Sequence, residues 1–550
     1  MNSDNRPSNS FVKQAAILAA ASIAVRILGF LYKLPLTDLI GDEGNAIYGI
    51  GYNVYNLFLV ISSAGLPAAI SKLVSEKRAI GRHDLAHRIF KISLLLAASV
   101  GALFMAVIFV FADEITALLG TPMAYLALQT LAPTVFIVAI MAVIRGYFQG
   151  MNSTVPTAIS QVVEQVFNAI FSVVLAHTLW NYALRQGHAA ATYGAAGGTA
   201  GTGVGAVAGL IVVAGLYFIA RPDILRQMRY ARRRNRNSNS NNADAANAVI
   251  VRNVSVTAFT IVAGTAIFSI ANLIDSWLVV DRLTAAGLGD VRARELFGQL
   301  SAKFNPLTNL PAAISSSLAI ALVPAIAASK ALGDNADVQD KLNTALRVAM
   351  LLTFPIAFGF GVLGVPIVTL LFPNHPEGGT LLMLGFPSII FLAASQIATG
   401  VLQAIGKTRI PVFAALIGAA VKLGVGYALM SDPRINIYGA IIGTTLMFLI
   451  TAAINCFFLC KHTGARLDFV GMALKPAISA FAMALGCFVA YHFAYILLGS
   501  NAVAVAAAVL FGMMLYVAFM LLIKGFSAAD IRFLPRGKKA LAFLQRRGLM

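Results

Sequence analysis

Residues 92–111 read ISLLLAASVGALFMAVIFVF, a run of about twenty residues without a charged side chain. A helix of this length spans the roughly 30 Å hydrocarbon core of a bilayer. The rest of the chain has the same character: of its 550 residues, 59% are hydrophobic and only 11% are charged, and the mean hydropathy is +0.81. This composition excludes an ordinary soluble domain and predicts an all-α integral membrane protein.

Apolar runs of similar length recur and predict about fourteen transmembrane helices. They cover residues 15–34, 48–70, 92–111, 123–144, 157–179, 193–219, 254–280, 306–328, 345–372, 380–402, 410–430, 437–459, 473–498 and 502–523. Arg26 and Lys33 interrupt the first run and no convincing cleavage site follows it, so we interpret it as a membrane helix rather than a signal peptide.

The basic residues predict the orientation of the chain. It has 41 Lys and Arg against 22 Asp and Glu, a net charge of +19, and most of the basic residues fall in alternate short loops and in the C-terminal tail. By the positive-inside rule, both termini are expected in the cytoplasm. Because no separate basic domain stands apart from the apolar runs, we expect these charges to meet membrane lipids rather than nucleic acid. The three cysteines lie inside apolar runs, which excludes a disulfide framework.

Two short motifs occur twice at nearly equal separations. LPAAIS occupies residues 66–71 and 310–315, and a Gly-Gln-Pro pattern at 146, 149 and 156 returns at 400, 403 and 411. This predicts two parallel six-helix lobes around a cleft, followed by two further helices. The expected division is an N-lobe at 1–220, a basic cytoplasmic linker at 221–251, a C-lobe at 252–460, two helices at 461–524 and a basic cytoplasmic tail at 525–550.

Ionisable residues inside apolar runs are costly in lipid and are therefore functional candidates. Arg26 and Lys33 lie about two helical turns apart on one face of the first run, with Gly29 between them. Two cations with a backbone gap between them suit a phosphate or pyrophosphate group. The alternatives are that Lys33 extends toward the headgroups and that Arg26 pairs with a carboxylate such as Asp275 or Glu164.

Further charges mark the second half of the chain. Asp275 and Arg282 share one face of the seventh run. Asp275 is a candidate counter-ion for Arg26, a candidate proton or sodium site, or a member of a structural ion pair. Lys303 is expected near the outer mouth of the cleft, and Lys422, in the eleventh run, is a further candidate cavity charge.

The fifth run carries a polar stripe in which Ser160 or Gln161, Glu164 or Gln165, and then Asn168 recur at helical spacing. The stripe either forms hydrogen bonds between helices or lines a cavity. In the next run, GTGVGAVAG at 201–209 resembles a dinucleotide fingerprint but has no flanking strands. We interpret its small residues as a surface for close helix packing.

Other near-motifs carry no chemistry. GVLQAIGKT at 400–408 has the wrong glycine spacing for a Walker A loop, and His83 and His87 lack an evident third metal ligand. The sequence offers no Ser-His-Asp or Cys-His constellation either. We therefore expect a protein that is not an enzyme, with no cofactor and no metal site.

Three segments resemble one family of bacterial membrane proteins. They read FLYKLPLTDLIGDEGNAIYGIGYNVYNLFLVISSAGLPAAISKLVSE at 30–76, RGYFQGMNSTVPTAISQVVEQ at 145–165 and NLPAAISSSLAIALVPAIAAS at 309–329. They resemble polysaccharide-biosynthesis flippases related to stage V sporulation protein B, of the multidrug/oligosaccharidyl-lipid/polysaccharide exporter superfamily. The resemblance implies a bacterial plasma-membrane protein with fourteen helices, two lobes and alternating access. It also implies export of lipid-linked saccharides such as the peptidoglycan precursor lipid II.

The same resemblance implies that basic residues of a central cavity hold the pyrophosphate of the precursor. The matching positions are Arg26, Lys33, Arg282 and Lys303. Asn168 stands where relatives are expected to carry Arg, a difference that Lys422 is expected to offset.

Two other functions compete with export of a lipid-linked saccharide. A cation/drug antiporter of the same fold, coupled to protons or sodium, needs carboxylates in the cavity, for which only Glu164 and Asp275 are available. A non-transporting scaffold for cell-wall synthesis leaves the intramembrane charges unexplained. The excess of basic residues favours an anionic cargo, which agrees with the undecaprenyl-pyrophosphate-linked saccharide that the resemblance implies.

Overall fold

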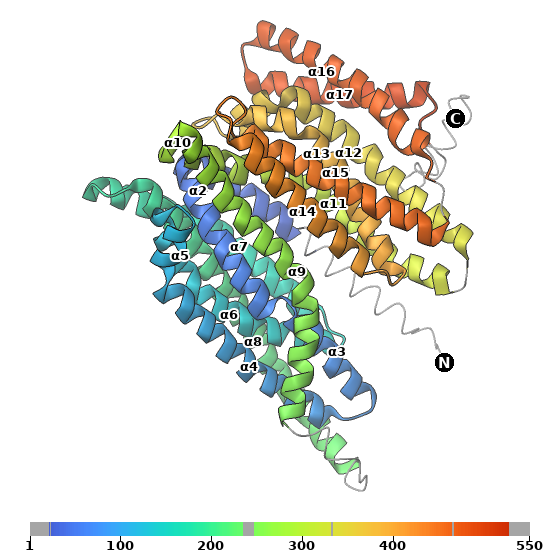
Figure 1. Ribbon diagram of the computed structural model, residues 1–550. Helices are drawn as coiled ribbons and strands as arrows, with labels where there is room; N and C mark the ends of the chain where they lie inside the picture. Colours follow the sequence, from blue (N-terminus) through green and yellow to red (C-terminus); the bar gives the residue numbers. More distant parts are fainter. Residues whose placement is uncertain (1–20, 22–23, 235–246, 332–333, 465–466, 527–550) are drawn as a thin grey trace. The chain divides into compact units, whose positions relative to one another are not determined.

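The computed structural model describes residues 21, 24–234, 247–331, 334–464 and 467–526 (Figure 1). Within these ranges the regular elements are all helices. The chain forms two compact units, Met1–Trp277 and Leu278–Met550, called unit 1 and unit 2 below. The five-part division expected from the sequence stays a prediction.

The helices of unit 1 follow the apolar runs of the sequence. They are α2 (Lys33–Leu59), α3 (Leu66–Ala79), α4 (His83–Val110), α5 (Ala112–Leu118), α6 (Tyr125–Gly150), α7 (Val155–Gln186), α8 (Ala190–Arg234) and α9 (Asn247–Leu283), of which α9 ends in unit 2. α8 packs against α7 and α6, while α6 also packs against α3 and α4 (Figure 1). The helix carrying the first LPAAIS copy thus packs against the helix carrying Gly146 and Gln149.

The helix α2 is broken at Gly41, where φ is 67° and ψ is 178°. Glycine adopts this conformation without the steric cost that a Cβ would add. The Asn45 side chain bridges the break, because its Nδ2 donates to the carbonyls of Thr37 at 3.0 Å and of Gly41 at 2.7 Å. These bonds give partners to carbonyls at the interruption. The residues between the first two predicted spans are therefore helical around a fixed break rather than an open loop.

Unit 2 has the same all-helical character. Its helices are α10 (Asp290–Gly298), α11 (Asn305–Ala331), α12 (Asn335–Leu371), α13 (Gly379–Ala404), α14 (Arg409–Met430), α15 (Tyr438–Thr463), α16 (Lys475–Leu498) and α17 (Asn501–Leu522), with short π-helical segments η5 (Thr284–Leu288), η6 (Gln299–Phe304) and η7 (Val470–Leu474). α13 packs against α11, α12 and α15, and α14 packs against α15. The helix with the second LPAAIS copy thus packs against the helix that carries Gly400 and Gln403.

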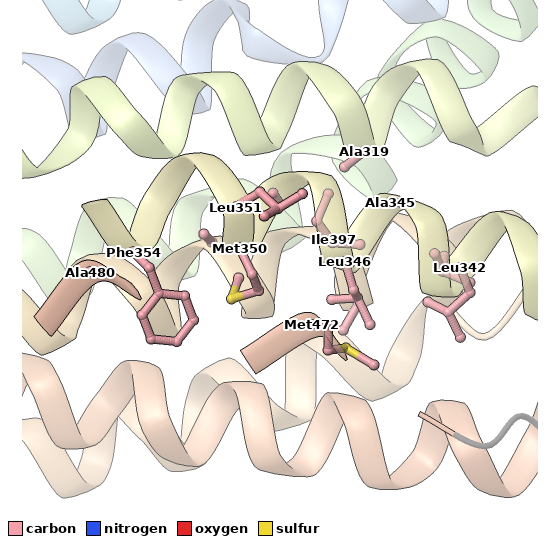
Figure 2. Packing of buried hydrophobic residues seen from close by; sticks show 14 of the residues in the cluster. Ala319, Leu342, Ala345, Leu346, Met350, Leu351, Phe354, Ile397, Met472 and Ala480 are labelled. Carbon is pink, nitrogen blue, oxygen red and sulfur yellow. The ribbon is translucent and has the colours of Figure 1, made fainter. Parts of the chain in front are cut away.

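The core of unit 2 lies along α12. Figure 2 shows Leu346, Met350 and Phe354 of α12 in one buried cluster with Ile397 of α13 and Met472 of η7. The two last helices, α16 and α17, pack against this side of α12. A polar contact fixes them there, because the Tyr516 hydroxyl of α17 donates to the Leu351 carbonyl at 3.0 Å.

Eleven helices among the described residues are long and apolar enough to cross a membrane. Large apolar side chains on these helices point outward, for example Leu103, Phe109, Phe488, Leu510 and Met514, all at least 45% exposed. Side chains of this kind are stable in contact with lipid and are costly in water. The protein is therefore a multi-span integral membrane protein, and the exact count of fourteen spans stays a prediction. Of the first predicted span, residues 15–20, 22 and 23 lie outside the described residues.

Candidate functional site

The helices α7 and α8 meet along a row of glycines, which we call the glycine seam: Gly197, Gly201, Gly205 and Gly209 of α8. A Cβ added at Gly205 would lie 2.5 Å from the Glu164 carbonyl oxygen, and one at Gly201 would collide with the backbone of Ser172. The backbones therefore approach closely, as small residues in membrane helices allow. This confirms that GTGVGAVAG serves helix packing rather than nucleotide binding.

The polar stripe of α7 faces this seam. Ser172 donates to the Asn168 Oδ1 at 2.8 Å and to the Gly198 carbonyl at 2.8 Å, and Thr202 of α8 donates to the same Asn168 oxygen at 3.3 Å. Of the two interpretations of the stripe, hydrogen bonding between helices thus accounts for Asn168. It also explains how this residue is accommodated where relatives are expected to have Arg.

Glu164 forms an ion pair within unit 1. Its Oε2 accepts from the Nη2 of Arg145 on α6 at 2.7 Å, and the Nε of Arg145 donates to the Ser160 hydroxyl at 2.9 Å. The side chain of Arg145 is only 11% exposed and that of Glu164 is 28% exposed. Shielding of this degree strengthens the attraction and makes either charge costly alone. Arg145 lies just beyond the apolar run 123–144, so hydropathy did not mark it as a candidate.

The predicted headgroup residues of the first span lie next to α7. A Cβ at Gly29 would come 3.3 Å from the Gln165 amide nitrogen, so the helical residues around Gly29 pack against α7 one residue from Glu164. Arg26 lies one turn before Gly29 with an exposed side chain, and Lys33 lies one turn after it with a half-buried side chain. The two cations thus flank the point at which this stretch meets α7, and their contact with a substrate stays a prediction.

Asp275 lies on the part of α9 that belongs to unit 1. The neighbouring Ser276 is buried, and its hydroxyl oxygen accepts from the Nδ2 of Asn53 on α2 at 2.7 Å. Two turns earlier on α9, the hydroxyl oxygen of Ser269 accepts from the Nδ2 of Asn56 at 3.4 Å. Asp275 itself is half-buried. Polar contacts therefore hold α9 against α2 on both sides of this carboxylate, and sequence spacing alone did not indicate these partners.

Three tyrosines of α2 form an aromatic row in unit 1, in which Tyr48 and Tyr55 are buried. Tyr48 and Tyr52 stack with ring centroids 5.9 Å apart, and Tyr52 meets Tyr55 at 5.5 Å. Their spacing of three or four residues places them on one helix face. This aromatic row was visible in the sequence as YGIGYNVYNLF at 48–58 but carried no charge to draw attention to it.

The remaining candidate cations lie in unit 2. Arg282 donates through Nε to Asp281 at 2.8 Å, and its guanidinium stacks over the Tyr427 ring at 4.6 Å. Lys422 is half-buried on α14, where a Cβ at Gly443 of α15 would lie 2.9 Å from the Lys422 carbonyl oxygen. Both residues thus lie where α14 meets its neighbours, and their contact with a substrate stays a prediction.

Lys303 has a different setting. Its side chain is fully buried, and its ammonium donates to the backbone carbonyls of His375 at 2.7 Å and Glu377 at 3.0 Å. It also lies over the Phe372 ring, 5.7 Å from the centroid. A buried ammonium held by carbonyls anchors a loop. The described residues contain no group of three or more His, Cys, Asp or Glu placed to hold a metal ion.

Comparison with known families decides the classification. The profile described as "Polysaccharide biosynthesis protein" matches residues 11–330. The chain belongs to this polysaccharide biosynthesis family. A second profile, MatE, matches residues 302–428 of the same chain. Proteins of these families are membrane transporters and flippases of the MOP superfamily rather than catalytic enzymes.

Relatives of this polysaccharide biosynthesis protein are found in Bacillus subtilis (strain 168). It is 25% identical to the lipid II flippase MurJ over 477 residues, 83% of this chain and 84% of the relative. It is 28% identical to stage V sporulation protein B over 459 residues, 81% of this chain and 83% of the relative.

Solved structures show that the fold of this family member is that of MOP transporters. The lipid II flippase MurJ in its inward closed conformation matches with a TM-score of 0.62 at 16% identity, over 92% of this chain and 98% of MurJ. An inward-facing MATE-family multidrug resistance transporter matches with a TM-score of 0.65 at 14% identity, over 81% and 98%. These likenesses establish the fold and leave the cargo open.

Proposed function

We propose that this protein flips undecaprenyl-pyrophosphate-linked saccharide precursors, lipid II for peptidoglycan among them, from the inner to the outer leaflet. Arg26 and Lys33 bind the pyrophosphate, since a guanidinium and an ammonium on one helix face suit a polyanion. The lipid tail stays in the bilayer while the headgroup crosses by alternating access. The lipid II flippase and the sporulation protein among the relatives support this choice.

One observation carries the choice of an anionic cargo. The antiporter alternative relies on Glu164 and Asp275 to attract a cation, but Glu164 is already paired with Arg145 at 2.7 Å. A paired carboxylate has lost most of its attraction for a second cation. Within the predicted spans, basic residues outnumber the carboxylates Glu164 and Asp275, which favours a negatively charged headgroup.

The membrane potential or an ion gradient across the membrane supplies the energy for the transport cycle. The sequence contains no ATP-binding motif, and an elementary charge crossing the membrane is worth about 2.3 kcal/mol per 100 mV. Asp275 is the candidate residue for a coupling proton or sodium ion, because it is a carboxylate within an apolar run beside the contact between α9 and α2.

The test measures how much undecaprenyl-linked precursor an external probe reaches in bacterial cells that rely on this protein alone. The native chain is compared with Arg26→Ala and with Arg226→Ala, a control on α8 whose side chain is 81% exposed. We expect Arg26→Ala to abolish the accessible precursor and Arg226→Ala to leave it unchanged, at equal expression. Unchanged accessibility with Arg26→Ala removes this residue from the mechanism, and no accessibility with the native chain overturns the flippase.

The antiporter remains the second candidate because the MatE profile matches residues 302–428 and MATE transporters share the fold. It predicts efflux of a cationic dye such as ethidium, driven by a proton or sodium gradient in vesicles. Dye efflux together with absent precursor accessibility would favour this alternative.

A further inference from the structure

Unit 2 contains a pocket of about 400 Å³ that the proposed function does not use. It forms where α10, the start of η6, the segment entering α13 and the turn before α15 meet. Under the predicted topology these are the outer ends of the surrounding spans. Its volume lies in the range of pockets that hold small molecules.

The polar side chains in this pocket are mixed and nearly balanced in charge. Arg292 is the cation and Glu377 the carboxylate, while Gln299, Thr380, Asn436 and Tyr438 are neutral. Arg292 is itself paired with Glu295 at 2.7 Å. Tyr438 donates its hydroxyl hydrogen to the Thr380 Oγ1 at 3.1 Å, which directs the Thr380 hydrogen toward another acceptor.

The walls of the pocket are held in place without a ligand. The buried Lys303 ammonium holds the carbonyls of His375 and Glu377. The backbone then passes directly over Gln299, because a Cβ at Gly378, whose φ is 93°, would lie 3.1 Å from the Gln299 Cβ. On the other side, the Asn436 side chain accepts from the Ile437 amide at 2.5 Å. A pocket fixed in this way loses little entropy when it binds a ligand.

We propose that this pocket binds a neutral, hydroxylated saccharide at the outer face of the protein. Each sugar hydroxyl both donates and accepts a hydrogen bond, and amides, hydroxyls, one guanidinium and one carboxylate meet that need. A polyanion would call for surplus cations, and a cationic drug for surplus carboxylates. The proposal rests on the proposed function in one respect, since the saccharide headgroup delivered to the outer leaflet is one source of the ligand. A free saccharide outside the cell has the same chemistry.

The experiment uses the full chain in lipid nanodiscs and measures binding of di-N-acetylchitobiose, a soluble neutral disaccharide, by saturation-transfer NMR. The test variant is the double substitution Thr380→Val and Tyr438→Phe, which removes two hydroxyls and keeps the shapes of the side chains. We expect saturable binding to the native chain and at least tenfold weaker binding to the double variant. The matched control is Tyr495→Phe on α16, which is 47% exposed and outside the pocket, and which should bind like the native chain.

A second variant guards against misfolding as an explanation. Val365 lines the pocket and is 40% exposed, so Val365→Trp fills the space without removing a hydrogen bond. It should abolish binding at unchanged thermal stability. Absence of saturable binding of both the disaccharide and a lipid-linked saccharide to the native chain, or binding that neither variant weakens, overturns the proposal.

A lipid-linked saccharide tested in the same nanodiscs distinguishes the sources of the ligand. Binding of both probes, weakened by the double variant, supports recognition of the saccharide from either source. Binding of the lipid-linked probe alone, weakened in the same way, assigns the pocket to the translocated headgroup. Precursor accessibility in cells is measured separately: normal accessibility with no pocket binding overturns this inference and leaves the proposed function standing.

Discussion

Arg145 on α6 and Glu164 on α7 form an ion pair with Nη2 and Oε2 2.7 Å apart. Ser160, one turn before Glu164, accepts the Nε hydrogen of the same guanidinium at 2.9 Å. The pair joins two helices of unit 1 at a place where the apolar surroundings make either charge costly without the other.

We expect Arg145→Gln and Glu164→Gln to lower the thermal unfolding midpoint in detergent, because each leaves the partner uncompensated. The double variant should be more stable than the sum of the single effects predicts, with a coupling of about 1–3 kcal/mol. The unfolding midpoints of the two single variants and the double variant are measured by intrinsic fluorescence during heating. Strictly additive losses would show that the pair is energetically unimportant. Arg226→Gln, which breaks an exposed pair with Asp223, should change stability by less than about 0.5 kcal/mol.

The glycine seam makes a second prediction. Gly201→Ala places a methyl group against the backbone of Ser172 and should cost about 1–3 kcal/mol of stability. Gly215 lies on the same helix with no heavy atom within 4 Å of an added Cβ, so Gly215→Ala should be neutral or stabilising by up to about 1 kcal/mol. Both are measured as thermal midpoints in one detergent. Equal effects at the two positions would contradict close contact at the seam.

A substitution at Lys303 tests whether this residue anchors a loop or contacts the substrate. Lys303→Met keeps the length of the side chain but removes the donors to His375 and Glu377. We expect a loss of about 1.5–3 kcal/mol of stability. Lys407→Met, at an exposed position, is the control and should have no effect. If Lys303→Met leaves the thermal midpoint intact but removes precursor accessibility, Lys303 acts on the substrate instead.

The predicted orientation is tested at the two ends of α14. In a background with Cys456, Cys460 and Cys487 replaced by Ala, Arg434→Cys should react with a membrane-impermeant maleimide in intact cells. Lys407→Cys should react only after the cells are permeabilised, because its loop is predicted to be cytoplasmic. Both positions are exposed, so burial does not explain a difference. The reverse pattern would invert the topology of the whole chain.

Much of the fold follows from the sequence, because lipid allows few structures. A run such as residues 92–111 has only the helix available to it, and the structure places α4 at His83–Val110. The small residues at 201–209 likewise identified a packing surface. Helix ends were harder, since α8 continues to Arg234 beyond its apolar run and α2 begins at Lys33. Hydropathy predicts which residues contact lipid, but it does not predict the residue at which a helix ends.

The candidate site was less predictable. Charges within apolar runs were visible, but their partners depend on which helices meet. Glu164 is paired with Arg145. Arg145 directly follows the apolar run 123–144, so hydropathy assigned it to a loop. Lys303 donates to the backbone carbonyls of His375 and Glu377, and carbonyls are groups that every residue carries and no sequence pattern marks.

Backbone lying against backbone along the glycine seam also has a mechanical meaning. Side chains between two helices act as a compliant layer, whereas the glycines at 197, 201, 205 and 209 bring the backbone of α8 directly against α7. We therefore expect α7 and α8 to move as one rigid body within unit 1. Any bending that a transport cycle demands of this unit is then expected at its other helix contacts rather than along this pair.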